Sequence, residues 1–338
     1  MTRGLASSTA KNYKVGQSHY LSFGASRGLS SQQLFPPSPA TVLAFTAYLY
    51  LLPSTISYST IKSYLCHAKS IVTMLGHDGE SFSCPRLAHA LRTVKRERGS
   101  KTRQKRIPIT ISLLSVFLPL LDRSLTKHSA LAAVLCVGVY GLFRSGELVP
   151  KQNNSASLFR RHVCWEDDKA TIRLDHSKTD PFRVGVDVVI YANGTDSCPF
   201  AALRHHWHAA PLQHPNAPVF QNDDGSAFTY SQLNNSVKNL ADAVGLDHTR
   251  FSGHSLRIGG ATSLAILGYP AHVIQALGRW KSLSYQLYTR MTDETRRSVA
   301  QKLGSGGRVE GTNYFGGMAL NDACSLSLDT IEAVWKTK

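Results

Sequence analysis

Residues 1–98 carry apolar side chains at the spacing of amphipathic helices, interrupted by short polar breaks. Ser38-Pro39 combines a favoured N-cap residue with a proline at the first helical position, so a helix is expected through Thr41–Leu51. The pattern predicts a small helical bundle. Its other helices are expected around Tyr13, Tyr20 and Phe23, from a cap at Ser59 to an end at Gly76, and from Pro85 through Leu87, Leu91 and Val94.

The pattern changes in the rest of the chain. Residues 130–140 are apolar on all sides, which is typical of a helix in a protein core. Three later segments have strand character and predict a small antiparallel sheet, so the expected fold class is mainly α with a small antiparallel β-sheet. The expected strands are Val163–Trp165, Ala170–Leu174 and Arg183–Ile190, and further helices are expected over Ile111–Leu121 after a cap at Thr110, over Pro199–His208, and over Ser231–Val244 before Gly245.

The length of the chain indicates how many domains it has, and its charge indicates what kind of partner it binds. A chain of 338 residues is too long for one compact core, so we expect a helical domain over 1–98, a linker over 99–108 and a second domain over 109–338. The net charge of +16 and the pI near 9.7 indicate a polyanionic partner, because such an excess of charge is otherwise self-repulsive.

Part of this charge is concentrated in a basic run, from Arg92 to Arg106, in which only Glu97 is acidic. The run could be a solvated tail or a nuclear-localisation signal, but a segment between two folded domains is better suited to lie along a phosphate backbone. Both roles could coexist. The DNA contacts expected from this run are Lys95, Arg96, Arg98, Lys101, Arg103, Lys105 and Arg106, with Lys62 added from the helical domain.

Other classes find little support in the sequence. No apolar stretch has the length of a membrane span, and residues 1–4 show no hydrophobic signal region. The His205-His206-x-His208 cluster is expected at the surface without a metal, because its spacing does not bring three imidazoles to one face. No phosphate-binding loop of the Walker type is present, so neither ATP nor a helicase cycle is implied, and no cofactor is expected. Six scattered cysteines indicate reduced thiols of an intracellular protein: Cys66, Cys84, Cys136, Cys164, Cys198 and Cys324.

The most informative chemistry begins at His254-Ser-Leu-Arg257 and continues in an apparently helical stretch through Trp280 to Tyr288. An imidazole, a guanidinium, an indole N–H and a phenol suit attack of a tyrosine hydroxyl on a phosphodiester. Cations can stabilise a phenolate, and a planar guanidinium can hold the charged oxygens of the phosphorane. Each residue alone has an ordinary structural explanation, such as capping or packing. Their combination indicates a catalytic site.

Two upstream segments complete the pattern. Arg144 ends the apolar helix and is followed by Glu147, and Lys178 lies between two predicted strands. The order Arg144, Lys178, His254-x-x-Arg257, Trp280 and Tyr288 resembles the hallmark of the tyrosine recombinase (phage-integrase type) family over most of residues 107–292. The resemblance implies a helical core-binding domain and an α+β catalytic domain that together form a C-shaped clamp on double-stranded DNA.

The resemblance also implies a mechanism. Arg144 and Arg257 hold the scissile phosphate with help from His254 and Trp280, Glu147 has a supporting role, Lys178 protonates the leaving 5′ oxygen, and a tyrosine forms a 3′-phosphotyrosyl link without metal or ATP. Tyr285 and Tyr288 compete as the nucleophile. Tyr288-Thr-Arg resembles the family's nucleophile box, so Tyr288 is expected to react and Tyr285 to pack.

The segment after His254 and the Leu-Gly-Arg-Trp phrase at 277–280 look most like eukaryotic mobile-element recombinases of the crypton type. That likeness implies excision and integration of an element by a homotetramer on synapsed DNA, in the nucleus of a eukaryote or otherwise with DNA in the cytoplasm. Leu328–Trp335 has the pattern of an amphipathic helix, either exchanged between neighbouring subunits or simply packed. Two alternatives stay open: a DNA-relaxing enzyme of the type IB topoisomerase class, and a DNA-binding protein that has lost catalysis.

Overall fold

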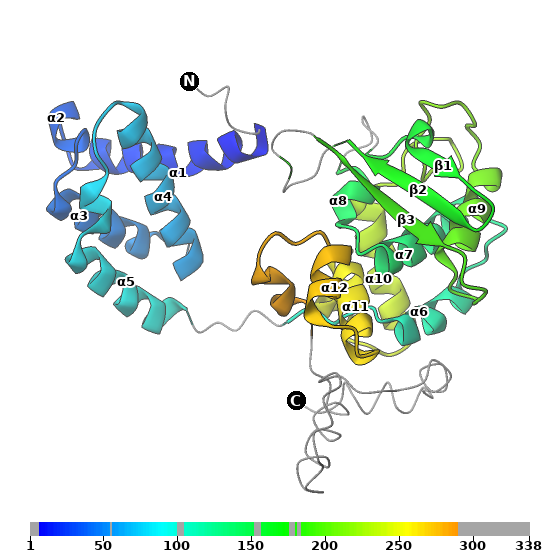
Figure 1. Ribbon diagram of the computed structural model, residues 1–338. Coiled ribbons are helices and arrows are strands. Elements are labelled where there is room, and N and C mark those ends of the chain that lie inside the picture. Colours follow the sequence, from blue (N-terminus) through cyan, green and yellow to red (C-terminus); the bar gives the residue numbers. More distant parts are fainter. Residues whose placement is uncertain are drawn as a thin grey trace, which may run out of the picture. The chain divides into compact units, whose positions relative to one another are not determined.

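The structure is a computed structural model that describes residues 7–54, 56–99, 105–151, 157–175, 180 and 184–289. The chain divides into two compact units, Met1–Gln104 and Lys105–Lys338, whose boundary falls inside the predicted linker. In the described residues both units are mainly helical, and the three strands found there all belong to the second unit (Figure 1). Among the described residues, no helix is both long enough and apolar enough to cross a membrane.

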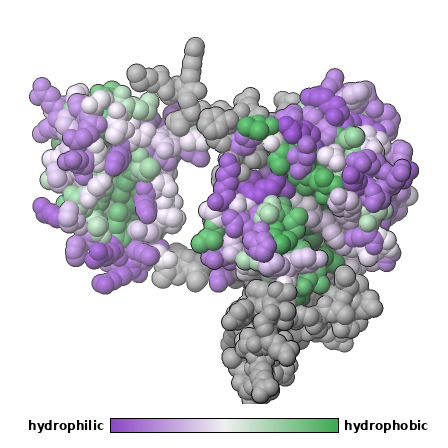
Figure 2. All heavy atoms as spheres, viewed as in Figure 1, coloured by the Kyte–Doolittle hydropathy of each residue, from purple (hydrophilic) through white to green (hydrophobic). Residues whose placement is uncertain are grey.

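The first unit is a helical bundle, as predicted. Helix α1 (Ser7–Ser26) packs against α4 (Tyr58–Met74), and α3 (Pro39–Leu51) packs against α5 (Pro85–Arg98). Aromatic side chains fill the centre, where the ring of Tyr20 meets that of Phe45 edge-on at 5.0 Å. Hydrophilic residues cover much of the visible face of this unit and of the second one (Figure 2). The remaining short elements are α2 (Ser31–Leu34) and the 3-10 turn Glu80–Ser83.

Helix starts in this unit follow the capping residues. The Ser38 hydroxyl accepts a hydrogen bond from the Thr41 amide at 3.1 Å, which confirms the predicted cap. The cap predicted at Ser59 is wrong by two residues. Ser57 is in extended conformation and its hydroxyl accepts from the Thr60 amide at 3.2 Å, so α4 begins at Tyr58.

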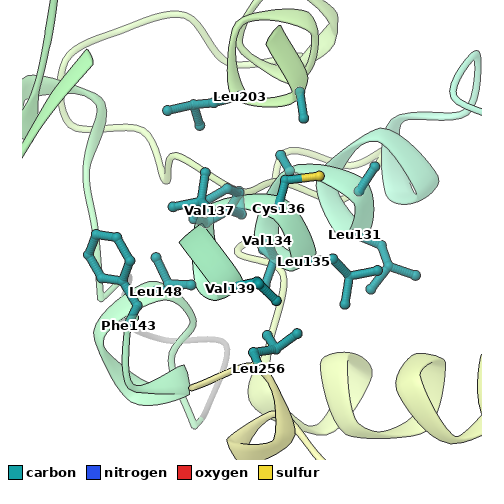
Figure 3. Close-up of a cluster of buried hydrophobic side chains, with 14 of the residues drawn as sticks. Leu131, Val134, Leu135, Cys136, Val137, Val139, Phe143, Leu148, Leu203 and Leu256 are labelled. Atoms are coloured by element: carbon teal, nitrogen blue, oxygen red, sulfur yellow. The ribbon is translucent and has the colours of Figure 1, made fainter. Parts of the chain in front are cut away.

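Helix α7 (Thr126–Tyr140) forms the centre of the second unit, as its apolar sequence predicts. Every residue from Ser129 to Val139 is buried. Leu203 of α9 (Pro199–Ala209) and Leu256 of α11 (His254–Ile266) approach α7 from opposite sides (Figure 3). The same core includes residues of α6 (Ile111–Phe117), α8 (Ser145–Leu148) and α10 (Tyr230–Ala243).

The small sheet has the predicted antiparallel form. Strands β1 (Val163–Trp165), β2 (Lys169–Leu174) and β3 (Val186–Tyr191) pair in the order β1-β2-β3. Alternate residues are buried, among them Ile172 and Ile190, so one face of the sheet packs on the core. Residues 181–183, at the predicted start of the third strand, lie outside the described residues. The other elements are α12 (Ala271–Leu277) and the 3-10 turns Leu118–Leu120, Arg160–His162, His248–Arg250 and Leu283–Leu287.

The end of the predicted linker is fixed to the second unit. The Ile107 amide donates to the Arg250 carbonyl at 3.0 Å, and the Ile109 amide donates to the Ser255 carbonyl at the same distance. Both isoleucines are buried. The chain therefore joins the second unit along the start of α11, before the predicted boundary at residue 109.

The histidine cluster on α9 differs from the surface site expected for it. His206 is 0% exposed, while His205 and His208 are exposed. Nδ1 of His206 lies 2.8 Å from the Ser129 hydroxyl, and its Nε2 accepts a hydrogen bond from the Gln221 amide at 3.1 Å. The ring is therefore buried and hydrogen-bonded on both nitrogens. Among the described residues no group of three or more metal-ligating side chains comes together.

Candidate active site

Helix α11 carries two of the predicted catalytic residues, His254 as its first residue and Arg257 one turn later. Gly259 and Gly260 let the helix approach its neighbours very closely. A Cβ on Gly259 would lie 1.7 Å from the Ile109 carbonyl oxygen, and one on Gly260 would lie 2.2 Å from that of Val139. The Gly-Gly pair therefore seats the helix against both α7 and the incoming chain, and so fixes the position of Arg257.

Arg257 is held by backbone carbonyls. Its side chain is 1% exposed, and its terminal nitrogens donate to the carbonyl oxygens of Leu142 and Gly278. The guanidinium carbon also lies 4.1 Å from the ring centroid of Trp280. A guanidinium has five N–H donors, and the two carbonyls accept from both terminal nitrogens of this one.

Arg144 and Glu147 form the second part of the site, after α7 ends. Arg144 Nη1 lies 2.7 Å from Glu147 Oε1, and the Arg144 amide donates to Glu147 Oε2 at 2.9 Å. The Glu147 side chain is 6% exposed and that of Arg144 is 22% exposed. The carboxylate therefore orients the guanidinium from the protein side and leaves part of it open to solvent.

Trp280 and Tyr288 do not continue the helix of His254, so the expectation of a single helical stretch is wrong. Helix α11 ends before Gly268, where φ is 81°. The chain then forms α12 and turns at Arg279. Gly278 makes that turn possible, because a Cβ there would lie 1.7 Å from the Trp280 ring. Tyr288 follows the 3-10 turn Leu283–Leu287.

The Tyr288 ring lies among the other predicted residues. Its centroid is 5.3 Å from that of His254 and 5.1 Å from that of Trp280, and the Arg257 guanidinium carbon is 5.9 Å from it. Tyr285 is instead 8% exposed and belongs to the apolar cluster that contains Trp280. Tyr288 packs against the same cluster but is only partly buried and lies beside the Arg257 guanidinium. That Tyr288 and not Tyr285 is the nucleophile stays a prediction.

The buried cations affect each other's protonation. Burial, followed by the guanidiniums of Arg144 and Arg279, lowers the pKa of Arg257 to about 9, so Arg257 stays protonated at neutral pH. Burial, followed by Arg257, Arg106 and Arg144, lowers the pKa of His254 as well. An uncharged imidazole can accept a proton, and a bound anion would be stabilised by the uncompensated positive charge.

Arg279 is a site residue that sequence reasoning missed. Its Nη2 lies 3.0 Å from Glu147 Oε2 and its Nη1 donates to the Gly141 carbonyl at 3.0 Å. Its position next to Trp280, within the Leu-Gly-Arg-Trp phrase, was a signal in the sequence. The sequence alone did not show that this arginine turns inward to the same carboxylate as Arg144.

The remaining predicted residues are not all brought to this site. Lys178, Lys101 and Arg103 lie outside the described residues. Arg106 is near enough to His254 to lower its pKa. Of the other expected DNA contacts, the solvent-exposed ones are Lys62, Lys95, Arg96 and Lys105.

Arg98 differs from those exposed cations. It is half-buried, with its guanidinium carbon 3.9 Å from the centroid of the Tyr50 ring. Its side chain therefore has a structural contact within the first unit, in addition to any contact with DNA.

Residues 201–295 match the phage integrase family. Over 205 residues the chain is 30% identical to an integrase/recombinase XerD homolog of Selenomonas ruminantium, a match that covers 57% of this chain and 56% of that protein. The chain thus spans little more than half the length of the curated relative it matches. The family match includes His254, Arg257, Trp280 and Tyr288, and Arg144 lies before it.

Solved structures share the fold at low sequence identity. A Tn1549 transposon integrase in complex with transposon right end DNA gives a TM-score of 0.55 at 14% identity, over 86% of this chain and 99% of that one. A lambda integrase dimer bound to a COC′ core site gives 0.52 at 16% identity, over 86% and 90%. XerH site-specific recombinase bound to its palindromic difH substrate gives 0.51 at 18% identity, over 79% and 70%. The chain is thus similar to the phage integrase family over residues 201–295, and it shares its fold with these solved integrases and recombinases.

Proposed function

We propose that this protein is a site-specific DNA recombinase, which cleaves and rejoins DNA strands through Tyr288. The observation that carries the proposal is the placement of the Tyr288 ring against His254 and Trp280, with the buried guanidinium of Arg257 beside it. A phenol needs nearby positive charge to act as a nucleophile at neutral pH, and this site supplies that charge in a buried environment.

The proposed step is a balanced transfer of a phosphoryl group. The Tyr288 oxygen bonds to phosphorus, the bond from phosphorus to the 5′ oxygen breaks, and the DNA is left attached through a 3′-phosphotyrosyl link. His254 accepts the phenol proton, since its lowered pKa keeps the imidazole uncharged. Lys178 donates a proton to the 5′ oxygen. Attack by a 5′ hydroxyl on the link reverses the step and releases Tyr288.

Arg144 and Arg257 hold the phosphate during this step. Attack adds negative charge to the non-bridging oxygens, and guanidiniums already oriented by Glu147 and by the Leu142 carbonyl can stabilise it without rearranging. The indole N–H of Trp280 donates but cannot carry a proton, so its part is packing and one hydrogen bond.

The proposed partner is double-stranded DNA, bound by a homotetramer that holds two recombining sites. A net charge of +16 and the exposed cations Lys62, Lys95 and Arg96 support a polyanionic partner. We further propose that the reaction excises and integrates a mobile element of the crypton type, with the protein in the nucleus of a eukaryotic host. The Arg-Ile-Gly-Gly-Ala-Thr-Ser segment from Arg257 supports this finer assignment.

The experiment is to trap the covalent link. The protein is incubated with a pool of nicked duplexes of randomised sequence, in which cleavage releases a short fragment and prevents rejoining. Adducts are separated under denaturing conditions and their DNA is sequenced. We expect an adduct through Tyr288, its loss in Tyr288→Phe with DNA binding retained, and its persistence in Tyr285→Phe. Loss of the adduct in Tyr285→Phe alone would contradict the assignment of the nucleophile.

The sequenced adducts then separate recombination from DNA relaxation. A duplex built from the recovered sequence is supplied twice, once in a supercoiled circle and once as a free partner. Joining of strands between the two molecules is expected for a recombinase. Relaxation of the circle without joined products would favour the topoisomerase alternative.

A further inference from the structure

The side chain of Arg279 connects the two arginines that face the phosphate site. We propose that Arg279 is a positioning residue, which acts through Glu147 on Arg144 and through the Leu142 carbonyl on Arg257. The inference rests on the proposed function, since it assigns a role in the same site. It concerns a residue that lies next to Trp280 and has no place in the reaction step described above.

The first connection is the shared carboxylate. Glu147 Oε2 accepts from the Arg144 amide at 2.9 Å and from Arg279 Nη2 at 3.0 Å, while Oε1 pairs with Arg144 Nη1 at 2.7 Å. With Glu147 only 6% exposed, little water can replace a missing partner. Arg279 therefore fixes the position of the carboxylate that orients Arg144.

The second connection is the carbonyl of Leu142. It accepts from Arg257 Nη1 and also from Arg279 Nη2, the latter at 3.3 Å. Leu142 has a φ of 48° and Arg279 has a φ of 57°, and both are left-handed conformations that are unfavourable for residues with a Cβ. The hydrogen bonds between the two turns hold both strained residues in place and keep the Leu142 carbonyl directed at Arg257.

Arg279 uses its donors on the protein. Nη1 donates to the carbonyls of Gly141 and Leu277, and Nη2 donates to the Leu142 carbonyl and to Glu147. Both terminal nitrogens of Arg279 thus have partners among the described residues, while its Nε is buried without one. A role in orienting the phosphate-binding arginines fits this use of the terminal nitrogens.

The first test needs no DNA. Arg279→Gln, Glu147→Gln and the double variant are compared by urea unfolding. If the two side chains depend on each other, the double variant will lose less stability than the two single losses added together. Additive losses would overturn the inference, whatever activity the protein has.

The second test measures the rate of adduct formation in a single turnover, with the affinity for the same DNA measured separately. We expect Arg279→Gln to slow cleavage by about 100-fold, because small displacements of catalytic groups cost about that much, while DNA affinity changes little. Arg279→Lys should recover part of the rate, since it keeps the charge and one bond to Glu147. Arg160→Gln is the matched control, because Arg160 is a buried arginine of the same unit that is bonded to Trp207 and Gln213.

Combining Arg279→Gln with a substitution of Arg144 tests whether Arg279 acts through Arg144. In an Arg144→Lys background, Arg279→Gln should cost roughly 10-fold or less, compared with about 100-fold in the wild type, because its effect then remains only through Arg257. Full multiplication of the two losses, or an equal loss in Arg160→Gln, would overturn the proposal. Absence of an adduct in the wild type would instead count against the proposed function, and the unfolding test would still decide whether Arg279 and Glu147 act together.

Discussion

Among the described residues of the second unit, two arginines are buried, and their surroundings differ. Arg160 is 5% exposed. It donates to the Trp207 carbonyl at 3.0 Å and to the Gln213 side chain at 2.6 Å, and its guanidinium carbon lies 3.6 Å from the Trp207 ring centroid. Burial is the cause that lowers its pKa. Its partners among the described residues are neutral: a carbonyl, a side-chain amide and an aromatic ring.

Arg257 has the same kind of neutral partners but different neighbours. It bonds to two carbonyls and lies against the Trp280 ring. Burial lowers its pKa, the positive charges of Arg144 and Arg279 lower it further, and the Glu147 carboxylate opposes this. The guanidiniums of Arg144, Arg257 and Arg279 and the single carboxylate of Glu147 leave an excess of positive charge in a largely buried site. Burial of an arginine therefore does not by itself distinguish structure from function. The excess of positive charge around Arg257 is what marks it as a candidate for function.

The largest effect that tests this comparison is expected from removing each arginine in turn. Arg257→Ala should raise the barrier to strand cleavage by about 3–4 kcal/mol, because a preorganised donor to the developing charge is lost. Arg160→Ala should lower stability and leave the cleavage rate of the folded protein unchanged. Single-turnover rates on trapped substrate and urea unfolding of both variants provide the measurement.

Arg144→Ala is the companion variant, and it should slow cleavage to a similar degree as Arg257→Ala. If Arg160→Ala slowed cleavage of well-folded protein as much as Arg257→Ala, the distinction between the two clusters would be wrong.

Lys178 provides the next test, since it would act on the leaving group and not on the charge of the phosphate. Lys178→Ala should slow cleavage on the order of 100-fold. A substrate with a bridging 5′ sulfur should restore the rate, because a thiolate leaves without a proton. Arg257→Ala should not be restored by the same substrate. Equal restoration of both variants would remove Lys178 from the role of general acid.

His206 tests whether the polar groups near Arg160 serve stability. Burial, followed by Arg160, lowers the pKa of His206 to about 4, below its usual 6.5. The unfolded chain therefore binds more protons than the folded one between these values, and stability falls as the pH drops through that window. The loss should reach about 2 kcal/mol at pH 5 relative to pH 7.

The measurement for His206 is urea unfolding at pH 7 and pH 5. His206→Gln should be less stable at pH 7, because it loses bonds to Ser129 and Gln221, but its stability should depend less on pH. An unchanged pH dependence in the variant would mean that another group controls acid sensitivity.

The smallest effect is expected from the basic run, where salt weakens each charge. Replacing Lys101, Arg103, Lys105 and Arg106 with alanine should weaken binding to all DNA sequences alike and flatten the salt dependence of binding. The log–log slope should change by about 0.9 for each phosphate that the variant no longer neutralises. Affinity measured against salt concentration for wild type and variant decides this. An unchanged slope would indicate a solvated tail or an import signal.

The helix starts and ends that depend on residues close together in the sequence were largely predicted. Thr110 caps α6 through the Leu113 amide, Pro85 begins α5, and Gly245 ends α10 with a φ of 74°. Each of these depends on a residue and its close neighbours along the chain. The alternating pattern of β2 and the apolar run of α7 were predicted for the same reason.

The errors at Arg279 and His206 share a physical cause, which is contact between distant parts of the chain. Arg279 was missed because Glu147 lies 132 residues away and Gly141 lies 138 residues away. His206 was expected at the surface because its partner Ser129, 77 residues away, is supplied by another helix. The spacing of the histidines along α9 does not show that Ser129 of α7 packs against His206.

One feature of the fold has a mechanical consequence. The chain that joins the two units runs into the second unit beside α11, where the Ile107 and Ile109 amides bond to the carbonyls of Arg250 and Ser255. A pull on this connector is therefore borne first by bonds that flank His254 at the start of α11. With no room for a side chain at Gly259, the connector and the helix cannot slide apart without separating their backbones. The connector is therefore anchored on the helix that carries His254 and Arg257.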